Sequence, residues 1–236
     1  MNFETVTLII ECVGIASFSI SGTIVALSRK TDLFGALVFA MLTSFGGGLI
    51  RDTVLGITPP NLFVNPDYFL LVIICAAVSA VCFNFAFIKE TAELINRHKN
   101  DFLLELFDAI GLASFCVTGV NVALEAAPEQ AENAFLLIFC GCISGIGGGV
   151  LRDVVSGELP LIFRKNVYFI PALVGTLFYV FTRTAMDELL SAVLSIGIIT
   201  AIRVPAIIFH WNLPVPGGDG AAAASEAEDT DEGEGK

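Results

Sequence analysis

The sequence carries the pattern Gly-Gly-Gly-x-x-Arg-Asp twice, at residues 46–52 and 147–153, and both copies lie within long apolar blocks. Each glycine costs a helix about 1 kcal/mol relative to alanine. Ionisable side chains in an apolar environment are also expensive, and they usually face each other or a polar cavity. A fold that contains both copies must therefore supply partners for the arginines and aspartates. It must also contain interactions that offset the helix-propensity cost of the glycines.

The apolar blocks predict an all-α integral membrane protein. Hydrophobic residues make up 55% of the 236 residues and charged residues only 15%, whereas a soluble domain carries about 25% charged residues. A helix needs about 20 apolar residues to cross about 30 Å of hydrocarbon. We therefore expect seven transmembrane helices, of which the sixth is the shortest. The blocks are residues 5–27, 33–57, 67–88, 103–124, 133–156, 166–184 and 187–209.

Matched blocks indicate that the chain is a duplication. Residues 11–22 match residues 108–119 at an offset of 97, and the two glycine motifs match at an offset of 101. Two further matches follow the motifs, Gly56 with Gly157 and Pro59 with Pro160. The predicted units are a first three-helix repeat in residues 1–90, a second in residues 100–184, and a seventh helix in residues 187–210.

The odd number of helices in each repeat predicts how the repeats are related. The second unit must enter the membrane from the side opposite to the first, which makes the two units inverted repeats. Lysines and arginines of the short loops gather on one side, which is expected to be cytoplasmic. The N-terminus is then outside and the C-terminus inside. Residues 212–236 hold seven acids and one base, which predicts a disordered acidic tail.

Two interpretations of the glycine triplets are open. In the first, Gly46–Gly48 and Gly147–Gly149 break the second and fifth helices, and freed carbonyls replace part of a cation's hydration shell. In the second, the glycines let two helices pack closely. The presence of two matched triplets, each followed by Arg-Asp, favours the first interpretation.

The charged pairs Arg51-Asp52 and Arg152-Asp153 are expected near opposite mouths of one passage. They can form a symmetric gate or sense the membrane potential. Alternatively, each arginine reaches lipid phosphate while the aspartate caps a helix end. Arg203, in the seventh helix, either reaches the interface or pairs with an acid inside the membrane.

Polar side chains form matching stripes on the first and fourth helices. Glu11 and Asp108 begin the stripes, and a helical repeat of 3.6 residues brings further polar residues to the same side. The hydroxyls of the stripes belong to Ser17, Ser21, Ser114 and Thr118, and Ser44 and Ser144 lie just before the glycines. These groups either line a hydrophilic path or bond to neighbouring helices.

The sequence offers no signature of an enzyme or a metal centre. It contains neither a P-loop nor H-E-x-x-H, and Arg51 and Arg152 stand where G-x-G-x-x-G needs its last glycine. The six cysteines lie in apolar blocks without zinc-ligand spacing to the two histidines, so we interpret them as small buried side chains. We expect no enzyme activity, no cofactor and no nucleic-acid partner.

The doubled motif, the three-helix duplication and the seventh helix resemble the prokaryotic trimeric intracellular cation (TRIC) channel family. Its domain is also known as UPF0126 or the glycine transporter domain, and the resemblance covers residues 4–210. It implies a homotrimer among the lipids of a prokaryotic inner or plasma membrane, with a pore in each subunit for monovalent cations, chiefly potassium. It also implies that Gly46–Gly48 and Gly147–Gly149 meet at the pore centre, with potassium near both.

Two functions fit these features. A passive cation channel would dehydrate its ions partly at carbonyls and hydroxyls, and its acids would favour cations. The alternative is a secondary transporter of a small solute such as glycine, because inverted repeats with broken helices also serve that function. A purely structural membrane protein would leave the two glycine triplets unexplained.

Overall fold

The computed structural model describes residues 3–89, 93–164, 167–209 and 211, and the regular structure of these residues is helical throughout. The acidic tail predicted at residues 212–236 lies outside the described residues. The elements are α1 (Phe3–Ser28), α2 (Leu33–Leu55), α3 (Asn61–Val64), α4 (Pro66–Lys89), α5 (Glu93–Ala126), η1 (Pro128–Gln130), α6 (Ala134–Val155), α7 (Leu161–Arg164), α8 (Phe169–Thr182) and α9 (Glu188–Ile208).

Six of the described helices are long and apolar enough to cross a membrane, namely α1, α2, α4, α5, α6 and α9. This confirms the predicted class, an all-α membrane protein. The sixth predicted span is represented by α8, an apolar helix of 14 residues. At 1.5 Å per residue such a helix is about 21 Å long, which is shorter than the hydrocarbon layer. A seventh crossing therefore stays a prediction.

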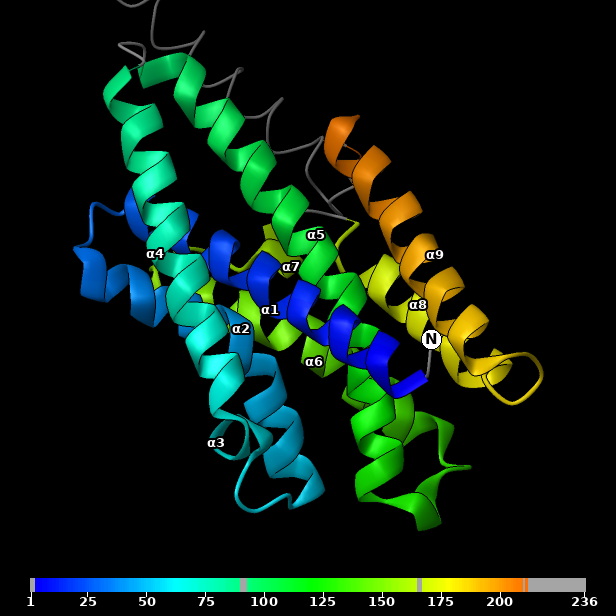
Figure 1. Ribbon diagram of the computed structural model, residues 1–236. Coiled ribbons are helices and arrows are strands. Elements are labelled where there is room, and N and C mark those ends of the chain that lie inside the picture. The colour runs from blue at the N-terminus through cyan, green and yellow to red at the C-terminus, as the bar shows by residue number, and fades with distance from the viewer. Residues whose placement is uncertain (1–2, 90–92, 165–166, 210, 212–236) are drawn as a thin grey trace, which may run out of the picture.

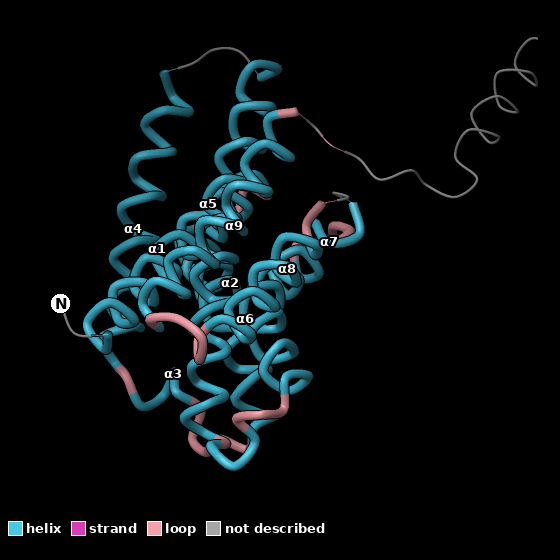
Figure 2. The backbone as a smooth tube through the Cα atoms, turned by 90° about the vertical axis from the view of Figure 1, so that its right-hand side faces the viewer, coloured by secondary structure: helices cyan, strands magenta, loops and turns pink. Residues whose placement is uncertain are grey.

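Helices α2 and α6 form the centre of the bundle. They pack along each other, α1 packs along α2 and α5, and α5 packs along α6. Figure 1 shows α4 and α9 on opposite sides of this centre, and Figure 2 shows α4 and α8 on opposite sides in the perpendicular view. The two glycine motifs, one in α2 and one in α6, thus occupy the middle of the molecule.

The aspartates of the two motifs fold the chain back in the same way. The Oδ2 atom of Asp52 accepts the backbone N–H of Asn61 at 2.8 Å, and Oδ2 of Asp153 accepts that of Leu161 at 2.9 Å. Each bond ties the end of a long helix to the start of a short one, α3 or α7. The first connection is one residue longer, so Pro160 corresponds in space to Pro60 and not to Pro59, as the sequence match suggested.

A contact between loops joins two connections that were predicted to share a side of the membrane. Arg29, in the loop between α1 and α2, forms an ion pair with Glu158, which follows α6. The contact agrees with the predicted grouping of these loops. It does not identify their side as cytoplasmic, and the orientation stays a prediction.

The glycine triplets do not break their helices. Both α2 and α6 remain α-helical through the triplets, so the prediction of broken second and fifth helices is wrong for this backbone. Figure 1 shows α2 changing direction between its first and second halves, which is a bend within a continuous helix. Carbonyls in a continuous helix stay hydrogen-bonded, and the triplets therefore need another explanation.

Close packing explains the first two glycines of each triplet. A Cβ atom on Gly47 would collide with the carbonyl oxygen of Ser144, and one on Gly148 with the carbonyl oxygen of Thr43. A Cβ on Gly147 would lie 2.9 Å from the Cα of Gly47. Small residues that let helix backbones meet are a common means of association within membranes. The contact between α2 and α6 offsets the helix-propensity cost of these glycines.

Replacing Gly148 with alanine should therefore destabilise the fold. The added methyl group would separate α2 from α6, and we expect a loss of about 1–3 kcal/mol, which is typical of overpacking. Thermal unfolding of the purified protein in one detergent measures the effect.

The matched control is Gly197→Ala in α9, where the space around a new Cβ is open. This variant should unfold at or above the wild-type temperature, because alanine favours helix. Equal losses in both variants would contradict a role of Gly148 in helix contact.

Candidate functional site

Both charged pairs of the motifs are buried. Arg51 and Arg152 are 4% and 0% exposed, and Asp52 and Asp153 are 1% and 3% exposed. Each arginine donates to the aspartate that follows it, at 2.6–2.9 Å in the first motif and 2.8 Å in the second. Their charges are thus compensated within the protein, not at a lipid headgroup as one interpretation proposed.

The guanidinium of each arginine lies beside the third glycine of its own triplet. A Cβ on Gly48 would lie 3.6 Å from Nη2 of Arg51, and a Cβ on Gly149 would lie 3.6 Å from Nη2 of Arg152, both in ordinary van der Waals contact. At Gly149 the nearest atoms are the Tyr168 hydroxyl and Oδ1 of Asp108, at 3.1 and 3.3 Å. Residues three apart share a helix face, so each guanidinium lies back over the glycine one turn earlier. The spacing Gly-x-x-Arg has a direct structural meaning that the sequence did not reveal.

Arg152 holds three helices together. Its Nη1 atom donates to Oδ1 of Asp108 on α5 at 2.8 Å and to the hydroxyl of Ser21 on α1 at 2.5 Å. With Asp153 on α6, the guanidinium has two carboxylate partners and one hydroxyl partner. Four of the predicted site residues, which the sequence places on three separate helices, therefore meet in one cluster. They are Ser21, Asp108, Arg152 and Asp153.

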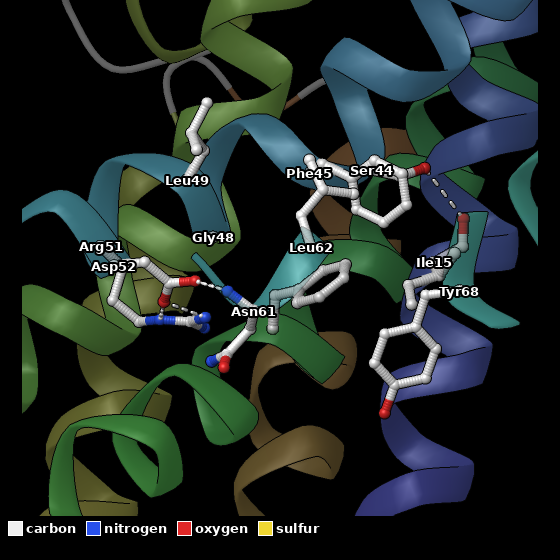
Figure 3. Close-up of a pocket in the computed structure, with 11 residues that line it drawn as sticks. Ile15, Ser44, Phe45, Gly48, Leu49, Arg51, Asp52, Asn61, Leu62 and Tyr68 are labelled. Carbon is white, nitrogen blue, oxygen red and sulfur yellow. Dashed lines mark hydrogen bonds and ion pairs between the residues drawn. The ribbon is translucent and has the colours of Figure 1, made fainter. Parts of the chain in front are cut away.

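Arg51 has fewer partners and lies beside a cavity. Its contact outside α2 is a 3.4 Å bond from Nη1 to the hydroxyl of Ser144 on α6. Figure 3 shows Arg51 and Asp52 at one end of a cavity of about 40 Å³, with Ser44 and Tyr68 towards the other end. About 10–15 Å³ of such space holds one water, so the cavity is large enough for a few waters.

Two tyrosines complete the site, and sequence reasoning missed both. The hydroxyl of Tyr68 donates to Oε2 of Glu11 at 2.7 Å. Tyr168 occupies the corresponding position in the second repeat, and its ring lies 4.6 Å from the guanidinium carbon of Arg203. The Tyr168 hydroxyl lies beside the carboxylate of Asp108, and both groups border Gly149. Each tyrosine stands eight residues after Pro60 or Pro160, a signal that could have found them.

The hydroxyls before the glycines are hydrogen-bonded to backbone carbonyls, and one stripe hydroxyl is buried without a described partner. Ser44 donates to the carbonyl of Ile15 at 3.1 Å, and Ser144 donates to the carbonyl of Cys140 at 2.6 Å. Thr118 is buried without a partner for its hydroxyl in the described part of the chain. Ser17 and Ser114 are buried as well. Whether these groups line a path stays a prediction.

A further polar pair, also missed from the sequence, lies between α5 and α8. The hydroxyl of Tyr179 donates to Oδ1 of Asn121 at 2.6 Å, and both residues are buried. No group of three or more histidine, cysteine, aspartate or glutamate side chains that could hold a metal ion occurs among the described residues. The six cysteines are free thiols.

Comparisons with known proteins extend over most of the chain. The family described as "Glycine transporter" matches twice, at residues 8–85 and 105–184. A UPF0126 membrane protein of Vibrio cholerae is 34% identical over 210 residues, which cover 87% of this chain and 81% of the relative. The UPF0126 inner membrane protein YadS of Escherichia coli is 29% identical, with coverage of 88% and 93%.

Solved structures of similar fold are cation channels. The TRIC trimeric intracellular cation channel orthologue from Rhodobacter sphaeroides aligns with a TM-score of 0.75 at 29% identity, covering 88% of this chain and 100% of its own. A prokaryotic TRIC channel studied in 0.5 M KCl aligns with a TM-score of 0.77 at 25% identity, covering 89% and 100%. Each alignment thus covers most of this chain and the full length of the solved structure.

Removing the hydroxyl of Tyr68 should weaken the fold. Tyr68→Phe leaves the carboxylate of Glu11 without its donor, and we expect a loss of about 1–3 kcal/mol in the free energy of unfolding. Thr53→Val, the control, removes an exposed hydroxyl of α2 and should change stability by less than about 0.5 kcal/mol. Thermal unfolding in detergent compares the two variants, and equal losses in both would refute the assignment.

Proposed function

Because the chain belongs to the UPF0126, or glycine transporter domain, family and resembles solved TRIC cation channels, we propose that it is a passive channel for monovalent cations, chiefly potassium. Its path runs inside each subunit, between α1, α2, α5 and α6. The relatives of known structure are named as cation channels, and this favours a channel over the alternative of a secondary transporter.

One observation carries the proposal. Two buried arginines lie over the third glycines of two triplets, and the triplets meet where α2 packs on α6. Charges at such depth in a membrane protein are expensive and usually mark an ion pathway. A pair of helices that touch through glycine has no side chains to separate, so a small movement can open a gap between them.

The site's charge suits cations. Four carboxylates surround the proposed path against three arginines, which leaves a net negative charge when all are ionised. The carboxylates belong to Glu11, Asp52, Asp108 and Asp153, and the arginines are Arg51, Arg152 and Arg203. An ion entering between the triplets would exchange part of its water for hydroxyl oxygens, including those of Ser44 and Thr118. In the packed arrangement described above, α2 and α6 close this route, and conduction requires them to separate.

We propose further that the protein has the arrangement expected from the duplication. Two inverted repeats, residues 1–90 and 100–184, would be followed by α9, with α8 as a short sixth span and the N-terminus outside. The paired aspartate bonds to α3 and α7 support this relation. A homotrimer is proposed because solved relatives are trimeric channels.

Planar bilayers containing the purified protein test the function. We expect unitary potassium currents whose reversal potential follows the potassium gradient, because a passive pore couples flux to nothing else. Bilayers treated with detergent alone are the control. Saturable uptake of glycine or another solute with fixed ion coupling, and without unitary currents, would overturn the channel in favour of a transporter.

A further inference from the structure

The two arginines occupy corresponding positions but are held very differently. Arg152 is bound by carboxylates on α5 and α6 and by a hydroxyl on α1, at 2.5–2.8 Å. Moving its guanidinium would leave Asp108 and Asp153 buried without their partner, and unpaired buried charges are strongly destabilising. Arg152 is thus tied to the frame of the bundle.

Arg51 can move at much lower cost. Its one carboxylate partner, Asp52, is the next residue of the same helix, so the ion pair can travel with α2. The single contact to another helix is the 3.4 Å bond to Ser144, which is longer than an ordinary N–H···O bond. The cavity beside Arg51 gives its guanidinium space to enter (Figure 3).

Arg203 accounts for the difference between the repeats. In the first repeat, Glu11, which corresponds to Asp108, accepts from Tyr68, and Arg51 donates to Asp52 and Ser144 instead. In the second repeat, Asp108 accepts from Arg152 and also lies beside the hydroxyl of Tyr168, on whose ring Arg203 stacks at 4.6 Å. Arg203 belongs to α9, which lies outside both predicted repeats, and it is only 2% exposed. One helix without a counterpart thus breaks the symmetry of the two arginines.

We propose that Arg51 is the moving gate of the path, that Arg152 is a fixed tie, and that Arg203 is the positioning residue that makes them different. The inference rests on the proposed channel function and refines its gating. Opening carries the guanidinium of Arg51 away from Ser144 of α6 and into the neighbouring cavity, while Arg152 stays bound to Asp108. The gate is therefore single and lies on one side of the α2–α6 contact, in place of the symmetric pair expected from the sequence.

Hydrogen exchange of the arginine side chains tests this without requiring current. The protein is labelled with ¹⁵N-arginine, and the Nε–H signals are assigned with Arg51→Lys and Arg152→Lys. The Arg152 signal should exchange at least about tenfold more slowly than that of Arg51. In Arg203→Met the Arg152 rate should rise towards that of Arg51, and Arg203→Lys, which keeps the charge but loses the planar stacking, should give an intermediate rate. Equal rates in the wild type, or no response to either Arg203 variant, would overturn the proposal.

Bilayer recordings test the gate itself. Arg51→Gln should raise the open probability by about tenfold, because the charge-assisted bonds that hold the closed position are weakened. Arg183→Gln, at an arginine in the turn between α8 and α9, is the control for loss of one positive charge. If the wild type conducts and Arg51→Gln has the same open probability, the role of Arg51 as the gate is refuted. A wild type that does not conduct but keeps the exchange contrast would refute the channel and leave the asymmetry standing.

Discussion

Two guanidinium groups buried at the centre of a membrane protein impose the main constraint on this structure. The lipid interior cannot compensate them, so each needs an acid. The aspartate that follows each arginine supplies it, and the guanidinium lies beside the glycine three residues before the arginine. The seven-residue motif therefore brings one carboxylate to its arginine, and Arg152 adds Asp108 and Ser21 from other helices.

The remaining glycines serve a different purpose, which is to bring α2 and α6 into backbone contact. Gly47 and Gly148 face carbonyl oxygens of the opposite helix, and neither position tolerates a side chain. In each triplet, the first two glycines form the helix contact and the third lies beside the guanidinium. This division of roles explains why both helices remain continuous even though their glycines are costly.

Helix α9 makes the two repeats inequivalent. Without a counterpart in the first repeat, α9 places Arg203 on the ring of Tyr168, beside the acid that binds Arg152. Inverted repeats alone would give two equivalent halves. For a passive pore, inequivalent halves mean that one side can open while the other maintains the fold.

The sequence by itself determined the membrane class and the duplication, because apolar length and repeated motifs are local properties of the chain. It left open whether the Arg-Asp pairs face lipid phosphate or the protein interior. It left open whether the glycines break or pack their helices, and it favoured the wrong answer. It also missed Tyr68 and Tyr168, whose roles depend on acids far away along the chain. Only the tertiary structure decided that Asp108 pairs with Arg152 while Glu11 pairs with Tyr68. Matching motifs predict matching positions, but the partners of each motif depend on which elements pack against it, and α9 packs mainly against α5 and α8 of the second repeat.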